Sequence, residues 1–161
     1  MFYPVVFRLH HADYHCLWFT DEKGQNQFLK DGEKTIHFRH QKEWRDYVLR
    51  EGLCTDHRQT LYDVNTAVKW LAENDPNVDC EYYLSLWHAT VDLAYSENRA
   101  FLGESRSTDV SAVYDKLFWG NNLPSLRREG ARFEPEWSLE ELAILRTIVS
   151  DIVEIIEAVF S

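Results

Sequence analysis

The sequence predicts an α+β fold, with an N-terminal antiparallel β-meander followed by helices that pack on the sheet and a long apolar C-terminal helix. Two observations carry this prediction. Short β-branched and aromatic runs fill the first forty residues, and the apolar spacing becomes that of a helix from residue 41 onwards. With 161 residues, 45% of them hydrophobic, and no internal repeat, the chain fits one domain over residues 1–161.

Four runs in the first forty residues have the composition of strands: residues 5–10, 14–19, 27–29 and 35–39. Turn residues separate them: Ala12-Asp13, residues 21–24 and the tight-hairpin dipeptide Asp31-Gly32. Runs joined this closely form an antiparallel meander. Alternation of apolar and polar residues is imperfect in the first two, which predicts that both faces of the sheet are partly covered.

Helical spacing begins with Trp44, Tyr47 and Val48, and Gly52 is placed to end that helix. Residues 61–64 predict one more strand, with Asn65 as the N-cap of a helix over 66–73.

Asp79 is placed to cap a longer helix that starts at Cys80, and residues 113–119 suggest a helical turn. The last helix carries the clearest start signal, because Ser138 and Glu141 form the pattern of a capping box. Its apolar face is wide, which predicts either a central position in the domain or packing on two sides, one of them a second subunit.

The formal charge is −10 at pH 7, from 17 Lys and Arg against 27 Asp and Glu. A negative field repels phosphate backbones and anionic lipid and speeds encounter with cationic partners. The sequence therefore predicts no nucleic-acid or membrane partner and favours a basic protein, with solubility alone as the other explanation of the charge.

A cytoplasmic location is expected. The three cysteines, Cys16, Cys54 and Cys80, are odd in number and match no paired spacing, which favours reduced thiols. The N-terminus has no basic region before an apolar run, and charged residues interrupt the apolar segment over 139–160.

Five histidines gather near the N-terminus: His10, His11, His15, His37 and His40. Strands could bring two or three of them to one face, as an acid–base pair or a metal site. No HExxH, GxSxG, GxGxxG or GxxxxGK[ST] motif accompanies them, so surface or half-buried histidines are the favoured interpretation. We expect no enzyme activity, no metal and no cofactor.

Basic residues concentrate between 99 and 132: Arg99, Arg106, Lys116, Arg127, Arg128 and Arg132. Acidic residues, including Glu104, Asp109, Asp115 and Glu129, lie among them, so a solvated mixed surface is favoured over a nucleic-acid site.

The acidic residues form three sets that we take as candidate partner-binding residues. The first is Glu73, Asp75, Asp79 and Glu81; the second includes Glu134 and Glu136 around Trp137; the third is Asp151, Glu154 and Glu157. Helix caps account for some acidic residues, such as Asp79. The remainder predict one or two negative patches, with aromatic anchors nearby, of the kind that binds a basic protein surface.

Residues 114–124 (YDKLFWGNNLP) and 134–141 (EPEWSLEE) resemble immunity proteins of bacterial contact-dependent growth inhibition and other polymorphic toxin systems. So does the plan of a small acidic α+β protein that closes on an apolar helix. The resemblance implies a cytosolic inhibitor that binds one cognate toxin domain, often a basic nuclease, and covers its active site or substrate surface.

The sequence thus predicts a toxin-neutralising immunity protein that binds the C-terminal domain of a toxin. Two alternatives stay open: a small hydrolase or nuclease that uses the N-terminal histidines, and a homo-oligomeric adaptor, for example a homodimer, that associates through the last helix.

Overall fold

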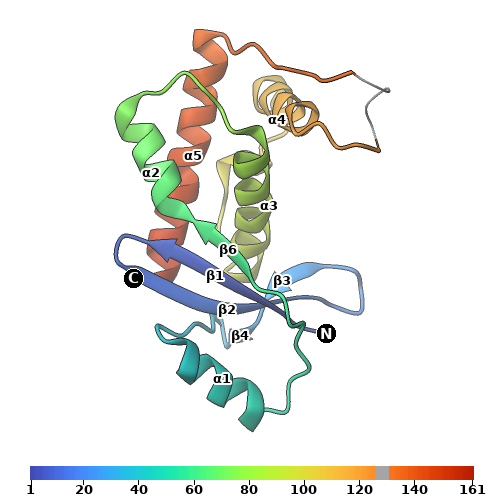
Figure 1. Ribbon diagram of the computed structural model, residues 1–161, viewed down its shortest axis with the longest axis vertical. Coiled ribbons are helices and arrows are strands. Elements are labelled where there is room, and N and C mark those ends of the chain that lie inside the picture. The colour runs from blue at the N-terminus through green and yellow to red at the C-terminus, as the bar shows by residue number, and fades with distance from the viewer. Residues whose placement is uncertain (126–130) are drawn as a thin grey trace.

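A computed structural model describes residues 1–125 and 131–161 and has an α+β architecture (Figure 1). The strands are β1 (Tyr3–Leu9), β2 (Ala12–Thr20), β3 (Asn26–Phe28), β4 (Lys30–Asp31), β5 (Lys34–Thr35) and β6 (Thr60–Asp63). The helices are α1 (Gln41–Arg50), α2 (Val64–Glu73), α3 (Cys80–Ser96), α4 (Thr108–Gly120) and α5 (Leu139–Phe160), with a short 3-10 turn, η1, at Leu102–Glu104. Arg127, Arg128 and Glu129, noted above for their charge, lie outside the described residues.

The main sheet has the order β3-β2-β1-β6. The pairs β1–β2 and β2–β3 are antiparallel, as the meander prediction requires. β6 departs from it, because β6 pairs with β1 in parallel, with Val6 opposite Leu61. A parallel pair needs a long crossover connection, and the chain between β1 and β6, which includes α1, supplies one.

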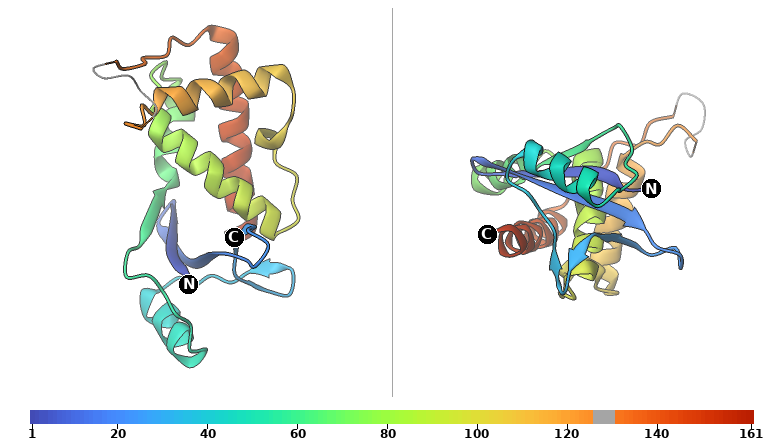
Figure 2. Two further views of the ribbon diagram at one scale, coloured as in Figure 1. Left: turned by 90° about the vertical axis from the view of Figure 1, so that its right-hand side faces the viewer. Right: turned by 90° about the horizontal axis from the view of Figure 1, so that it is seen from below.

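Both faces of the main sheet are covered, as the imperfect alternation predicted. Val5, Phe7 and Leu9 point into the core shared with α2, α3 and α5. Their neighbour Val6 points to the opposite face and is also buried. There α1 lies across the sheet from the other helices (Figures 1 and 2).

The first turn is His10-His11, and not Ala12-Asp13 as predicted. His10 has a positive φ of 55°, and the Asn65 side chain brackets its backbone: Oδ1 accepts from His10 N–H at 2.7 Å and Nδ2 donates to His10 C=O at 3.1 Å. Asn65 is therefore not the N-cap of α2. Asp63 fills that position, and its carboxylate accepts from the Asn65 backbone N–H at 3.1 Å.

Two other elements differ in length from their predictions. The strand expected over 35–39 ends at Thr35, because the chain leaves its short hairpin and joins β2 through a single bridge between Phe38 and His15. The helical turn expected over 113–119 is the longer helix α4. Ser107 caps it by accepting a hydrogen bond from Val110 N–H at 3.3 Å.

α5 begins at the predicted capping box, with the side chains of Ser138 and Glu141 each bonded to the other's backbone N–H. One side of α5 is buried through its length: Leu142, Leu145, Ile148, Val149, Ile152, Val153, Ile155, Ile156 and Phe160. Its other side carries charged residues such as Glu154, so α5 is an amphipathic core helix and not the long apolar helix that was predicted. No helix in the described part of the chain is long and apolar enough to cross a membrane.

Candidate partner-binding surface

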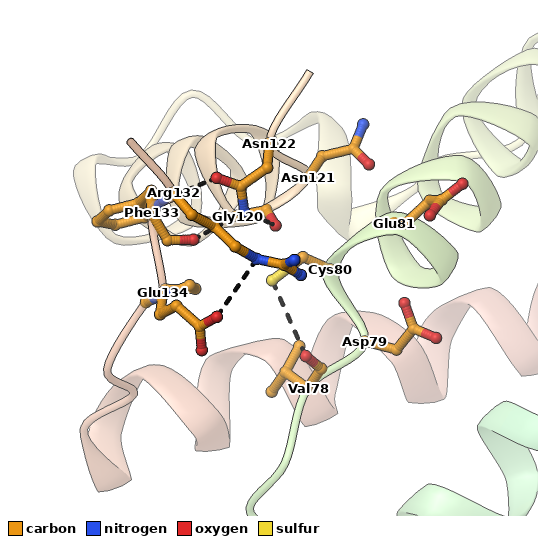
Figure 3. Close-up of a pocket in the computed structure, with 11 residues that line it drawn as sticks. Val78, Asp79, Cys80, Glu81, Gly120, Asn121, Asn122, Arg132, Phe133 and Glu134 are labelled. Carbon is orange, nitrogen blue, oxygen red and sulfur yellow. Dashed lines mark hydrogen bonds and ion pairs between the residues drawn. The ribbon is translucent and has the colours of Figure 1, made fainter. Parts of the chain in front are cut away.

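The first acidic set and Glu134 of the second set meet at the end of the molecule farthest from α1 (Figure 1). Asp79 and Glu81, at the start of α3, and Glu134, before α5, line one pocket of about 250 Å³ (Figure 3). Gly120, the last residue of α4, forms another wall of this pocket together with Asn121 and Asn122, which follow the helix. Residues more than fifty positions apart in the sequence therefore share one acidic surface.

A second pocket, of about 380 Å³, adjoins the first because both include Val78 and Asp79. It adds Glu73 and Asp75 together with the aromatic residues Trp70 and Tyr83, whose ring centroids lie 4.8 Å apart. We call the two adjoining pockets the acidic end, defined by Glu73, Asp75, Asp79, Glu81 and Glu134.

Some carboxylates of the acidic end also hold local structure. Asp79 caps α3 by accepting a hydrogen bond from Tyr82 N–H at 3.1 Å, and Asp75 accepts from the backbone N–H of Asn77 at 2.9 Å. The carboxylate of Glu81, in contrast, has no hydrogen bond or ion pair with any residue that the structure describes. Glu81 is thus the member whose charge is most available to a partner.

Basic side chains neutralise the acidic end only in part. Arg132 Nε lies 3.3 Å from Glu134 Oε1, and Lys69 Nζ lies 3.8 Å from Glu73 Oε1. These four side chains are all well exposed, and exposed pairs of this kind are weak, about 0–1 kcal/mol each. A partner that offers better-placed cations can therefore displace them at small cost.

Close packing at Gly120 fixes the wall between α3 and α4. A Cβ on Gly120 would lie 2.5 Å from Cys80 Sγ and 3.0 Å from Pro135 Cγ, so only glycine fits without displacing a neighbour. Burial raises the pKa of the Cys80 thiol to about 11, with Asp79 adding to the rise. Cys80 therefore stays protonated near neutral pH and serves as packing rather than as a nucleophile.

Exposed apolar side chains that were not among the predicted binding residues accompany these acids. Phe133 lines the first pocket and is 46% exposed, and Trp119, next to Gly120 at the end of α4, is 51% exposed. Large apolar groups rimmed by charge are typical of protein-binding surfaces. Phe133 directly precedes Glu134 in the sequence, a signal that could have found it, whereas Trp119 has no acidic residue within three positions.

The remaining candidate residues lie elsewhere. Glu136 is exposed beside Trp137, and its backbone C=O accepts a hydrogen bond from Lys116 Nζ. Asp151 and Glu154 line a separate pocket on the flank of α5, where Asp151 Oδ2 accepts from Leu102 N–H at 2.8 Å. Glu157 Oε1 lies 3.3 Å from His10 Nε2. The structure does not bring the third set to the acidic end.

Three of the N-terminal histidines, His10, His15 and His37, make structural contacts, and His40 lies close enough to His15 to add to the fall in pKa that burial causes there. His10 reaches Glu157 from its turn, whereas the His37 ring packs edge-on against Phe160 with centroids 5.1 Å apart. His15 pairs with Phe38 through its backbone, and burial lowers the pKa of its imidazole. Within residues 1–125 and 131–161, no group of three or more His, Cys, Asp or Glu is arranged to hold a metal ion.

No family model matches this chain, and no curated protein matches it. Among solved structures, it is similar to the crystal structure of the SatS C-terminal domain in complex with bromine. The two share 10% sequence identity with a TM-score of 0.52, over 98% of this chain and 91% of that chain. At this identity the likeness is one of fold alone.

Proposed function

We propose that this chain is an immunity protein that binds a basic toxin domain, a nuclease being the favoured class, and neutralises it by covering its active site or substrate surface. The observation that carries the proposal is the acidic end. Asp79 and Glu81 share one pocket with Glu134, and the exposed ring of Phe133 stands beside them.

Such a surface combines the two parts that recognition of a basic protein needs. Apolar anchors supply the area removed from water, and carboxylates complement the cations that a nuclease presents to phosphates. The net charge of −10 adds long-range attraction, so association should be fast at low salt and should slow steeply as salt screens the charges.

Three observations favour binding over the alternatives. The Glu157–His10 pair and the packing of His37 on Phe160 give N-terminal histidines structural partners, which weakens the hydrolase alternative. The wide apolar face of α5 is buried against the chain's own elements, which weakens the alternative of an adaptor that associates through this helix.

The test starts with co-purification of the tagged chain from its native host and identification of any bound protein. That protein is then expressed in a naive bacterium with and without this chain. We expect it to be basic and toxic, and we expect coexpression to restore growth. A captured protein that is acidic or harmless, or growth that coexpression leaves unchanged, would contradict the proposal.

The interface is then located by charge reversal. Glu81→Lys with Glu134→Lys should weaken complex formation, because both side chains lie in the first pocket and neither caps a helix. Glu154→Lys with Glu157→Lys makes the same change in net charge on the flank of α5 and serves as the matched control. An equal loss of affinity in both variants would mean that only the total charge matters. A loss of affinity in the control alone would indicate that the interface lies on α5.

A further inference from the structure

A different pocket lies where α3 meets the main sheet, apart from the acidic end. Its volume is about 310 Å³. Side chains from four strands and one helix line it, among them Tyr3, Trp18, Asn26, Tyr62, His88 and Asp92. Nothing in the proposed binding of a toxin uses this pocket.

The carboxylate of Asp92 is the ionisable acid of the pocket. Its Oδ2 accepts a hydrogen bond from the Trp18 indole N–H at 2.8 Å, while Oδ1 has no hydrogen-bond partner among the described residues. His88, one helical turn earlier, does not balance this charge. Partial burial lowers the pKa of His88 below 6.5, which favours the neutral ring at pH 7. Burial also raises the pKa of the Asp92 carboxyl, so its ionised form would gain from a cation placed beside it.

Aromatic residues hold the rest of the pocket in place. The rings of Tyr3 and Trp18 meet edge to face with centroids 5.4 Å apart, across paired positions of β1 and β2. Tyr62 is stacked on the buried Phe7 with centroids 5.4 Å apart. These contacts within the sheet and the core therefore preform the walls of the pocket in the absence of a ligand.

We propose that this pocket binds a small organic cation with a methylated ammonium group, held against Asp92 and bordered by Tyr3, Trp18 and Tyr62. Aromatic rings attract such cations through the negative faces of their π systems, and pockets lined by aromatic rings are a known way to recognise quaternary ammonium groups. Asp92 Oδ1 supplies the counter-charge. The site goes beyond the proposed toxin binding and does not depend on it.

The experiment uses choline and its neutral isostere, in which a tert-butyl group replaces the trimethylammonium group, titrated into the full chain. The readout is the NMR signal of the Trp18 indole N–H, assigned by its loss in Trp18→Phe. We expect choline to shift this signal and the isostere to bind at least about tenfold more weakly, since charge supplies the difference. Equal binding of the two probes, or no binding of either, would overturn the proposal.

Asp92→Asn then removes the charge while the amide oxygen still accepts from Trp18. We expect it to abolish the preference for choline. Asp109→Asn, at an exposed position in the first turn of α4, makes the same change in net charge and should keep the preference. A preference that survives in folded Asp92→Asn would refute the role of the carboxylate. If Asp92→Asn does not fold, the comparison of the two probes on the parent chain still decides the matter.

Discussion

The Asn122 side chain holds the backbone of Phe133 with two hydrogen bonds. Its Oδ1 accepts from Phe133 N–H at 2.6 Å, and its Nδ2 donates to Phe133 C=O at 2.8 Å. The Asn122 amide thus pairs with both the N–H and the C=O of Phe133, as the backbone of a neighbouring strand would. It positions an exposed aromatic ring beside the carboxylates of the acidic end, although the two residues belong to different segments.

Replacing Asn122 by glycine should release this contact without straining the backbone, because Asn122 has a positive φ of 51° that glycine adopts freely. We expect faster hydrogen exchange at Phe133 N–H and a loss of stability of about 1 kcal/mol. NMR hydrogen exchange and urea unfolding measure the two effects. Asn121→Gly is the neighbouring control, and unchanged exchange at Phe133 in Asn122→Gly would show that the amide is not the restraint.

Gly120→Ala should destabilise the protein, although alanine normally favours a helix by about 0.5–1 kcal/mol over glycine. The added Cβ would lie 2.5 Å from Cys80 Sγ, and such overpacking costs about 1–3 kcal/mol. Combining it with Cys80→Ala removes the sulfur and should recover part of the loss in a double-mutant cycle of urea unfolding. The contact would be contradicted if the two substitutions changed the free energy of unfolding additively, or if Gly120→Ala were more stable than the parent.

Acid should weaken the junction between α4 and α5. Lys116 Nζ lies 2.7 Å from Glu141 Oε2, and this contact, together with hydrogen bonds from Ser138, lowers the pKa of the Glu141 carboxyl below 4.5. The stabilisation is fully present above the unfolded-state value and is lost as the pH falls through the lowered folded-state value. Urea unfolding across this pH window should therefore show that the free energy of unfolding falls less steeply with acid in Glu141→Gln than in the parent. An identical dependence on pH would show that Glu141 does not contribute to the loss of stability.

A second loss of stability is expected at milder acidity, from His15 and His88. Burial lowers the pKa of both imidazoles below 6.5, so the unfolded chain binds these protons more readily than the folded chain. Stability should fall as the pH drops from 6.5 towards the folded-state values. The variants His88→Gln and His15→Gln should each reduce this dependence of stability on pH, as measured by thermal melting at a series of pH values. His11→Gln, at an exposed position, should leave the dependence unchanged.

Local signals in the sequence located most of the helices, because caps act within a few residues. Asp79 and the Ser138–Glu141 box were found from spacing alone, and both form the predicted bonds. The prediction that Asn65 is an N-cap was wrong for the same reason. Its residue type suits an N-cap, but its side-chain amide instead binds the backbone of His10, fifty-five positions earlier in the chain. Local composition carries no information about that contact.

The acidic end was predictable only in its parts. Sequence proximity grouped Asp79 with Glu81, and the structure keeps them together. Their meeting with Glu134 depends on the close approach of Gly120 to Cys80, which no spacing rule reports. The pocket at Asp92 was missed for a similar reason, since its walls come from β1, β2, β3, β6 and α3.

The parallel pairing of β6 with β1 bears on the order in which the chain folds. The β1–β2 hairpin closes through two residues, and its loop entropy is small. β6 finds the other edge of β1 only after the intervening chain, including β3 to β5 and α1, has been enclosed in a loop. Pairings so distant in sequence slow the search for the native state. We therefore expect the β1–β2 hairpin to be native-like early in folding. Pairing of β6 with β1 should be a late step, and the two hydrogen bonds between the Asn65 side chain and the His10 backbone should stabilise it.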